Sequence, residues 1–311
     1  MTRLVLDTLV TGLPLVASTM GVYMIFRLRE DFDLTVDASF TMGGAVTAVL
    51  LLHGWSLPLA CVLAVAAAGT MGALTASLHL ALRIPVILAG LVMSIGFYSV
   101  NLRVMGTPSL NVVDVPTLFS GYPTLGATQA DELTSLILAA VVLSALGLLA
   151  LFLRTELGLA LRATGVNARM ARSQGVNDRA LLVLSLVIAN ALAGLAGCLL
   201  VQDQGFADIN MGTGTLIAGV GAVLLGELLL RPTGSKVLRI VACAVVGALL
   251  YRLILVASLR AGLPAEDLQG VTALTLLVAV AAQRYGTLAW RGLRGPLRSP
   301  AGGGVAKADV A

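Results

Sequence analysis

The sequence is poor in charge, in aromatic side chains and in the residues that usually carry chemistry. Charged residues occupy 12% of the 311 positions and aromatic residues 5%, whereas a soluble domain has about 25% charged residues. This deficit argues against a water-soluble protein, and the 58% of hydrophobic residues indicates lipid as the surrounding medium. The 34 glycines suit helices that pack closely in a bilayer. We therefore predict an all-α membrane protein.

Motifs for catalysis, metal binding and phosphate binding are also missing. The two histidines, His53 and His79, stand alone, and the three cysteines lie in apolar stretches without a CxxC pair. No GxxxxGKS/T phosphate loop, HExxH helix or GxSxG elbow occurs, and no basic run with interleaved aromatics suggests nucleic acid. The sequence thus predicts no catalytic residue, no metal site and no cofactor bound by this chain. Any energy must come from an ion gradient or from a separate subunit.

Apolar runs along the chain are long enough to cross a bilayer. A helix needs about 20 apolar residues to cross the hydrocarbon core. Measured against that length, the sequence predicts about nine transmembrane helices: Val5 to Phe26, Leu34 to Leu52, Leu57 to His79, Ile84 to Asn101, Leu133 to Leu153, Leu181 to Val201, Met211 to Leu230, Val237 to Ser258, and Leu268 to Ala282.

Basic residues indicate which ends of these spans are cytoplasmic. The segment 154–179 has five arginines against two acidic residues, and the tail from Arg284 has four arginines and one lysine against Asp309. Lysine and arginine concentrate on the cytoplasmic side of membrane proteins, so both segments are predicted inside. The segment 106–131 has no lysine or arginine and is predicted outside. Nine alternating spans are consistent with these assignments and put the N-terminus outside.

Two stretches in different halves of the chain resemble each other. FDLTVDASFTMGGAVTAVLL from Phe32 and ADINMGTGTLIAGVGAVLLG from Ala207 align when Asp33 is set on Asp208. Five spans separate equivalent elements, so the halves, about 5–103 and 180–284, would have opposite orientations, as in an inverted-topology repeat. Polar residues interrupt the apolar pattern in both stretches, which predicts broken helices beside a central pathway. Chance similarity between two glycine-rich strings is the alternative.

Polar and small residues at the two breaks are the candidates for the translocation path. Ionisable groups at membrane depth are costly and usually face a cavity or a partner, which favours a role for Asp37. The alternative is that Asp37 caps the N-terminus of the second span; Asp33 could serve equally. The predicted path residues are Asp37, Ser39, Thr41, Gly212, Thr213 and Gly214 at the breaks, with Asn101 and Asn190 as further polar groups inside spans.

The sequence of segment 154–179 indicates two short helices that lie outside the membrane. Gly165 and Asn167 read as a helix stop and restart, in which Asn167 caps the second helix before Gly175 ends it. Met170 and Ala171 offer an apolar face that would fit a groove on a partner. The alternative is a loop whose arginines only set the topology.

Glu227, four residues before Arg231, is expected to pair with it on one helix face.

The same segment carries a resemblance to a known family. LGLALRATGVNARMARSQGVN (residues 157–177) resembles the cytoplasmic coupling segment of permease subunits in ATP-binding-cassette importers of the branched-chain amino acid and ribose class. DFDLTVDASFTMGGAV resembles the broken-helix motif of that class, and GVGAVLLGE its second-half counterpart. Together with SVNLRVMGTPSLN, these strings are most similar to the subfamily commonly assigned to tryptophan and tyrosine uptake. The likeness runs from about Pro14 to Gly286.

The resemblance implies a division of labour among several subunits in the bacterial cytoplasmic (inner) membrane. A permease domain (1–286), followed by a disordered cytoplasmic tail (287–311), would pair with a second copy as a homodimer. A separate ATPase would bind ATP and magnesium below it, and an extracytoplasmic binding protein would deliver an amino acid of the aromatic or branched-chain type. Coupling to the ATPase would fall on the segment 154–179, at Leu157, Gly158, Arg162, Ala163, Gly165, Asn167, Met170, Ala171 and Gly175.

Two other functions fit parts of the sequence. A secondary transporter driven by an ion gradient also uses inverted repeats and broken helices, but it leaves the paired cytoplasmic helices unexplained. A non-transporting subunit of a membrane complex would show no ATPase stimulation that depends on a substrate.

Overall fold

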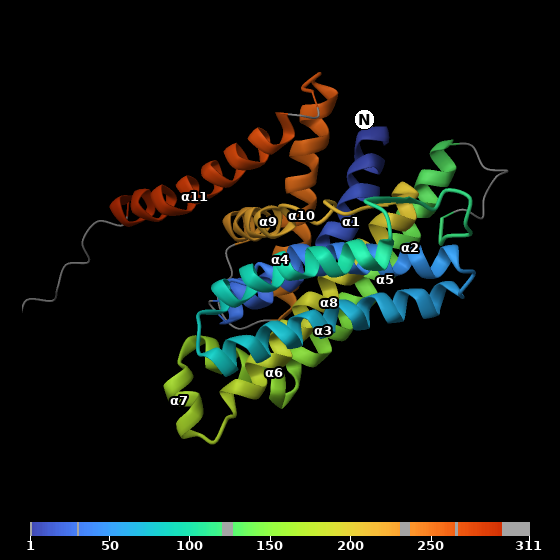
Figure 1. Ribbon diagram of the computed structural model, residues 1–311. Helices are drawn as coiled ribbons and strands as arrows, with labels where there is room; N and C mark the ends of the chain where they lie inside the picture. Colours follow the sequence, from blue (N-terminus) through green and yellow to red (C-terminus); the bar gives the residue numbers. More distant parts are fainter. Residues whose placement is uncertain (1, 30, 120–126, 231–236, 265–266, 294–311) are drawn as a thin grey trace, which may run out of the picture.

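The chain folds into helices of very different lengths. The computed structural model describes residues 2–29, 31–119, 127–230, 237–264 and 267–293. The elements (Figure 1) are α1 (Thr2–Tyr23), η1 (Met24–Arg29), α2 (Thr35–Leu52), α3 (Leu57–Leu82), α4 (Val86–Met105), β1 (Ser109–Asn111), α5 (Ala127–Arg154), α6 (Glu156–Val166), α7 (Ala168–Ser173), α8 (Asp178–Gln204), β2 (Phe206–Asp208), α9 (Thr215–Leu230), α10 (Val237–Arg260) and α11 (Leu268–Leu293).

The helices confirm an all-α membrane protein. In the described part of the chain, seven helices are long and apolar enough to cross a membrane, and two shorter apolar helices, α9 and the first part of α11, coincide with the seventh and ninth predicted spans. The seventh span does not begin at Met211 as predicted, because residues 211–214 form turns and the helix starts only at Thr215. The helix α11 continues to Leu293, so residues 287–293 of the predicted tail are helical, and residues 294–311 lie outside the described residues.

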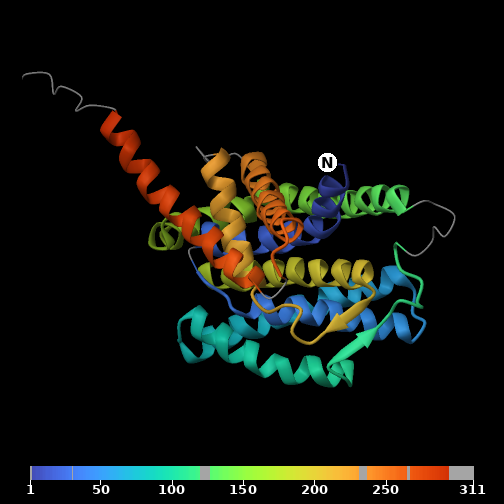
Figure 2. The ribbon, with the colours of Figure 1, turned by 90° about the horizontal axis from the view of Figure 1, so that it is seen from above.

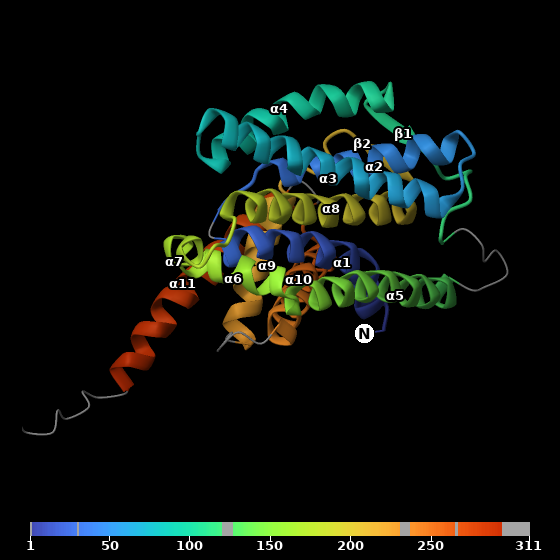
Figure 3. The same cartoon turned by 90° about the horizontal axis from the view of Figure 1, so that it is seen from below.

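The two halves of the chain pack crosswise on each other. The sixth predicted span, α8, packs on α2 and α3 of the first half, and the first span, α1, packs on α9 and α10 of the second half. Figure 3 shows α8 as the central helix, with α2 and α3 on one side and α1 on the other. A buried core of side chains from α1, α5, α8, α9 and α10, among them Met20, Leu146 and Tyr251, joins helices of the two halves.

Glycines let these helices approach one another at backbone distance. A Cβ added to Gly43 of α2 would lie 2.0 Å from the backbone oxygen of Gly194 in α8, and one added to Gly226 of α9 would lie 2.0 Å from that of Cys243 in α10. Both contacts leave no room for any side chain. Small residues at helix crossings are what the bilayer favours, since apolar side chains gain little there from leaving lipid.

The loops at the predicted outer end are tied together by a short sheet. Helix α8 ends at Gly205, whose positive φ of 76° reverses the chain at a helix C-terminus. The strand β2 follows and pairs antiparallel with β1, so that Ser109 lies opposite Asp208 (Figure 2). The helix pair α6 and α7 lies at the other end of the molecule (Figure 3), as expected if one end faces the cytoplasm and the other the outside.

Two ion pairs join α1 and η1 to the second half. Asp7 near the start of α1 pairs with Arg260 at the end of α10, and Arg27 of η1 pairs with Glu227 of α9, with 2.7 Å between Nε and Oε1. The prediction had assigned Glu227 to Arg231. Arg231 lies outside the described residues, and it is the sequence-distant Arg27 that reaches the carboxylate.

The close contact at Gly43 yields a test of the packing. We expect Gly43→Ala to lower the melting temperature of the purified chain by about 5 °C or more, because the new methyl group collides with backbone that cannot move aside. The matched control is Gly96→Ala in α4, where an added Cβ meets nothing within 4 Å. Equal melting temperatures for the two variants, measured in the same detergent, would contradict the packing described here.

Candidate translocation site

The first turn of α2 and the start of α9 meet at Asp37. Its carboxylate accepts hydrogen bonds from Gly214 N (3.0 Å), from Thr215 Oγ1 (2.8 Å) and from Leu216 N (2.8 Å). The first N–H groups of a helix have no partner within the helix, and a carboxylate there is stabilised by hydrogen bonds and by the helix dipole. The alternative prediction was that Asp37 caps the N-terminus of its own helix, the second span. Asp37 is indeed a helix cap, but the helix that it caps is α9.

The turn before α9 is pressed against α2. Gly212 N donates to Thr41 Oγ1 at 3.2 Å, and a Cβ on Gly212 would lie 2.0 Å from the backbone oxygen of Asp37. Gly214 has a φ of 85°, which favours glycine. These contacts explain why the apolar run from Met211 does not begin as a helix: the chain must first turn across α2 before α9 can start.

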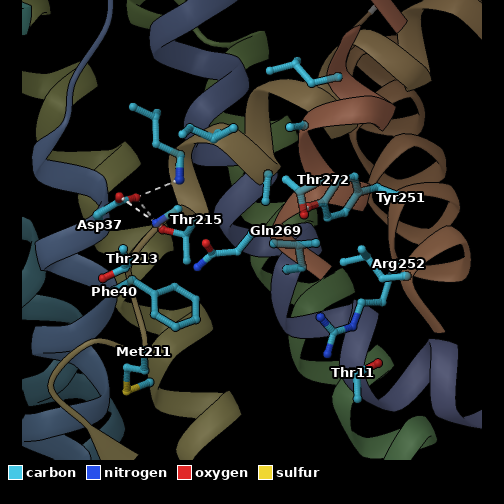
Figure 4. A pocket seen from close by; sticks show the side chains of 18 of the residues that line it. Thr11, Asp37, Phe40, Met211, Thr213, Thr215, Tyr251, Arg252, Gln269 and Thr272 are labelled. Carbon is cyan, nitrogen blue, oxygen red and sulfur yellow. Dashed lines mark hydrogen bonds between the residues drawn. The ribbon is translucent and has the colours of Figure 1, made fainter. Parts of the chain in front are cut away.

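A cavity of about 1250 Å³ opens beside this junction. Helices α1, α2, α9, α10 and α11 surround it, and the end of α8 contributes as well. Figure 4 shows Asp37 and Thr213 on one side and Thr11 and Arg252 on the other. The lining is mainly apolar; its polar side chains are Thr11, Asp37, Gln204, Thr213, Thr215, Tyr251, Arg252, Gln269 and Thr272.

Three of the eight predicted path residues line this cavity, and the other five are not part of its lining. Asp37, Thr213 and Gly214 lie on its wall. The remaining five are Ser39, Thr41, Asn101, Asn190 and Gly212.

The inner polar residues form a buried network between α2 and α8. Asn190 Nδ2 donates to Asp33 Oδ2 (2.8 Å), and its Oδ1 accepts from Ser39 Oγ (2.7 Å). Asp33 also accepts from Thr35 N at the start of α2 (2.9 Å). Asn101 Nδ2 donates to the backbone oxygen of Ala38. These groups hold helices together, because a buried polar side chain in a bilayer needs a partner inside the protein.

The prediction missed the polar residues on the far wall of the cavity. Tyr251 and Arg252 lie in α10, and Gln269 and Thr272 lie in α11. Tyr251 donates to Thr272 Oγ1 at 2.9 Å and so links the two helices. The signal for Arg252 was present in the sequence, since an arginine stands inside the eighth predicted span, where a charge is costly without a cavity or a partner.

The two short helices predicted in the segment 154–179 are present as α6 and α7. Thr155 caps α6, where its hydroxyl accepts from Gly158 N (3.4 Å), and Asn167 caps α7, where its side chain accepts from Met170 N (3.0 Å). Gly175 has a φ of 83° just after α7, as expected of a residue that ends a helix.

The predicted coupling residues divide into exposed and internal ones. Leu157 (56% exposed) and Met170 (65%) point outward, as does Ala163. Ala171 is buried, so the predicted Met170–Ala171 face reduces to Met170. Gly158 is also buried, and Arg162 donates to the backbone oxygens of Gly158 and Leu153. Val166, which the prediction left out, is 89% exposed and enlarges the apolar surface.

Helix α6 touches the first break directly. A Cβ on Gly165 would lie 1.6 Å from the backbone oxygen of Leu28 in η1. Beside this contact, Arg29 donates to Thr164 Oγ1 (3.2 Å) and forms an ion pair with Asp178 at the start of α8 (2.7 Å). Helix α6, which carries several of the predicted coupling residues, is thus anchored on the segment that leads into α2 and Asp37.

Comparisons with known proteins agree that this chain is similar to permease components of transport systems. The family model described as "Branched-chain amino acid transport system / permease component" matches residues 4–281. The tyrosine transport system permease protein of Clostridioides difficile is 31% identical over 278 residues, which cover 89% of this chain and 90% of that protein. The galactofuranose transporter permease protein of Escherichia coli is 28% identical over 282 residues, which cover 89% of this chain and 76% of that one. No solved structure matches.

The predicted resemblance to permeases of ATP-binding-cassette importers is confirmed by these matches. An autoinducer 2 import system permease protein of Escherichia coli is 27% identical over 222 residues, which cover 69% of this chain and 60% of that protein. The seven apolar helices and the family agree with a multi-pass protein of the inner membrane. The chain belongs to the family of branched-chain amino acid transport system permease components.

Proposed function

We propose that this chain forms half of the translocation path of an ATP-binding-cassette importer for amino acids of the aromatic or branched-chain type. A separate ATPase, which carries ATP and magnesium, docks on α6 and α7 and drives the path between its open states. The observation that carries the proposal is the contact of Gly165 with Leu28, since it joins the helix pair α6 and α7, with its exposed apolar side chains, to the segment that leads into α2. The tyrosine permease among the relatives supports the substrate class.

The route from the docking surface to the cavity follows named contacts. Movement of α6 would displace η1 through Gly165 and Leu28, and the Arg29–Asp178 ion pair would carry the displacement to α8. From η1 the chain leads in a few residues to Asp37, which holds the start of α9 on the cavity wall. Such coupling requires an element with two arrangements that both sites bias, and we propose that α9 is this element.

We infer in addition that the two halves form an inverted-topology repeat, which supports the same function. With Asp33 set on Asp208, α1 and η1 together correspond in length to α8, while α2 corresponds to α9 and α3 to α10. The contacts obey this correspondence, because α8 packs on α2 and α3 just as α1 packs on α9 and α10. Rocking of one repeat against the other around a fixed site is how such folds alternate access.

Two further partners follow from the proposed role. A second copy of this chain would complete the path across the cavity, and an extracytoplasmic binding protein would dock at the end that carries β1 and β2. The rival, a transporter driven by an ion gradient, predicts uptake that survives ATP depletion and collapses with an ionophore. The exposed Leu157, Val166 and Met170 on α6 and α7 favour a bound ATPase, since an apolar surface of this kind marks an interaction site.

Replacing Gly165 tests the coupling. We expect Gly165→Val to lower both uptake and substrate-stimulated ATP hydrolysis at least tenfold in the reconstituted importer, because a branched side chain pushes α6 off η1. The chain should still insert, since α6 lies outside the spans. Gly147→Val in α5 is the control, where an added Cβ meets nothing within 4 Å. Normal ATPase stimulation in Gly165→Val would contradict the proposed coupling from α6 through η1 to the cavity.

Replacing Asp37 tests its role at the cavity. Asp37→Asn keeps one acceptor for α9 but removes the charge that the helix N-terminus stabilises. We expect tyrosine uptake to fall at least fivefold, because the start of α9 is held less firmly on the cavity wall. The melting temperature should fall by less than about 3 °C. Asp114→Asn in the outer loop serves as the control for loss of an exposed carboxylate. A large loss of stability with unchanged uptake would reduce Asp37 to a structural cap.

A further inference from the structure

The two charged side chains that line the cavity differ in what surrounds them. The charge of Asp37 is met by two backbone N–H groups and one hydroxyl at the start of α9. Arg252, on the opposite wall (Figure 4), donates no hydrogen bond and forms no ion pair within the described residues, and its Nε is buried without a partner. The negative charge in the cavity is thus met by hydrogen-bond donors, whereas the positive charge has no hydrogen-bond or ion-pair partner among the described residues.

The position of Arg252 makes this charge costly unless something binds it. It lies eight residues before the end of α10, which places it roughly 12 Å along the helix from that end. The stem of Arg252 packs on α1, because its Cβ and Cγ lie 3.3 and 3.4 Å from where a Cβ on Gly12 would be. An arginine inside a span is costly without a cavity or a partner, and the cavity that Arg252 lines is the place where its guanidinium can meet water and solutes.

A guanidinium is the side chain best suited to a carboxylate. Its planar donors match the two oxygens of a carboxylate, and such charged hydrogen bonds are about twice as strong as neutral ones. The cavity lining also includes the hydroxyl of Thr11, on the same side as Arg252, the amide of Gln269, and apolar groups such as Phe40 on the side of Asp37 (Figure 4). A solute with a carboxylate at one end and an apolar body at the other fits this distribution.

We propose that Arg252 binds the carboxylate of the transported solute, so that the cavity selects carboxylate-bearing molecules with an apolar body. The inference rests on the proposed function, since it takes this cavity as the translocation path. In this role Asp37 orders α9, because its carboxylate accepts three hydrogen bonds from the start of that helix. Selection is thus by the anionic end of the solute.

Asp203 is the competing partner of Arg252. Its carboxylate attracts the guanidinium electrostatically but makes no ion pair with it. If Arg252 served only to neutralise Asp203, removing either charge would have the same consequence. If Arg252 binds solute, removing Asp203 leaves solute binding intact, because a competing negative charge is lost and the guanidinium remains.

Ligand-observed saturation-transfer NMR on the full chain in lipid nanodiscs tests the proposal. The probes are hydrocinnamate, which has a carboxylate, phenethylamine, which has an ammonium group on a similar body, and tyrosine. We expect hydrocinnamate and tyrosine to bind the wild-type chain and phenethylamine to bind at least tenfold more weakly. Arg252→Gln should weaken hydrocinnamate binding at least tenfold, and Arg252→Lys should retain part of it.

Two matched variants separate solute binding from structure. Arg260→Gln removes an arginine from the same helix at its outer end, where it pairs with Asp7 outside the cavity lining, and should bind hydrocinnamate as the wild type does. Asp203→Asn should also keep binding. Equal binding of phenethylamine and hydrocinnamate, no binding by the wild type, or wild-type affinity in Arg252→Gln would each overturn the proposal. The measurement needs neither ATP nor partners, so it can fail while ATP-driven uptake succeeds, and the reverse.

Discussion

The arrangement of the cavity depends on the hydrogen bonds between the carboxylate of Asp37 and the N-terminus of α9. A helix that starts inside a membrane leaves N–H groups that lipid cannot satisfy. Asp37 satisfies two of them and bonds Thr215 as well. Because this carboxylate comes from α2, the start of α9 is fixed by its contact with the first half of the chain. The cavity, the turn 211–214 and the close contact at Gly212 follow from that arrangement.

Crosswise packing supplies the rigidity around this junction. Helices α1 and α8 each pack on the helix pair of the other half, and glycines bring the backbones into contact without side chains between them. Such an interface cannot deform continuously, since any shift creates a backbone collision or a void. Displacing η1 at one end should therefore move whole helices, which makes the contact of α6 with Leu28 an effective point of control.

Much of the fold could be predicted from the sequence because the bilayer imposes length and polarity on each helix. The spans, the paired short helices and the caps at Asn167 and Gly175 follow from apolar length and local capping chemistry. Long-range pairing could not be predicted in this way. The bond of Asp37 to α9 and that of Glu227 to Arg27 join residues that are far apart in sequence, and Asn101 and Asn190, polar groups in apolar runs, proved to hold helices together. Arg252 was visible as a charge in a span, but only the fold shows that it lines the cavity.

The central claim is that events at α6 and α7 change the cavity. The most direct measurement is the rate at which a membrane-impermeant maleimide labels Thr213→Cys, on the cavity wall, in the reconstituted complex with and without ATP. The account predicts that ATP changes this rate at least fivefold, and that the change disappears when Gly165 is replaced by valine. Equal labelling rates in the two nucleotide states would contradict it.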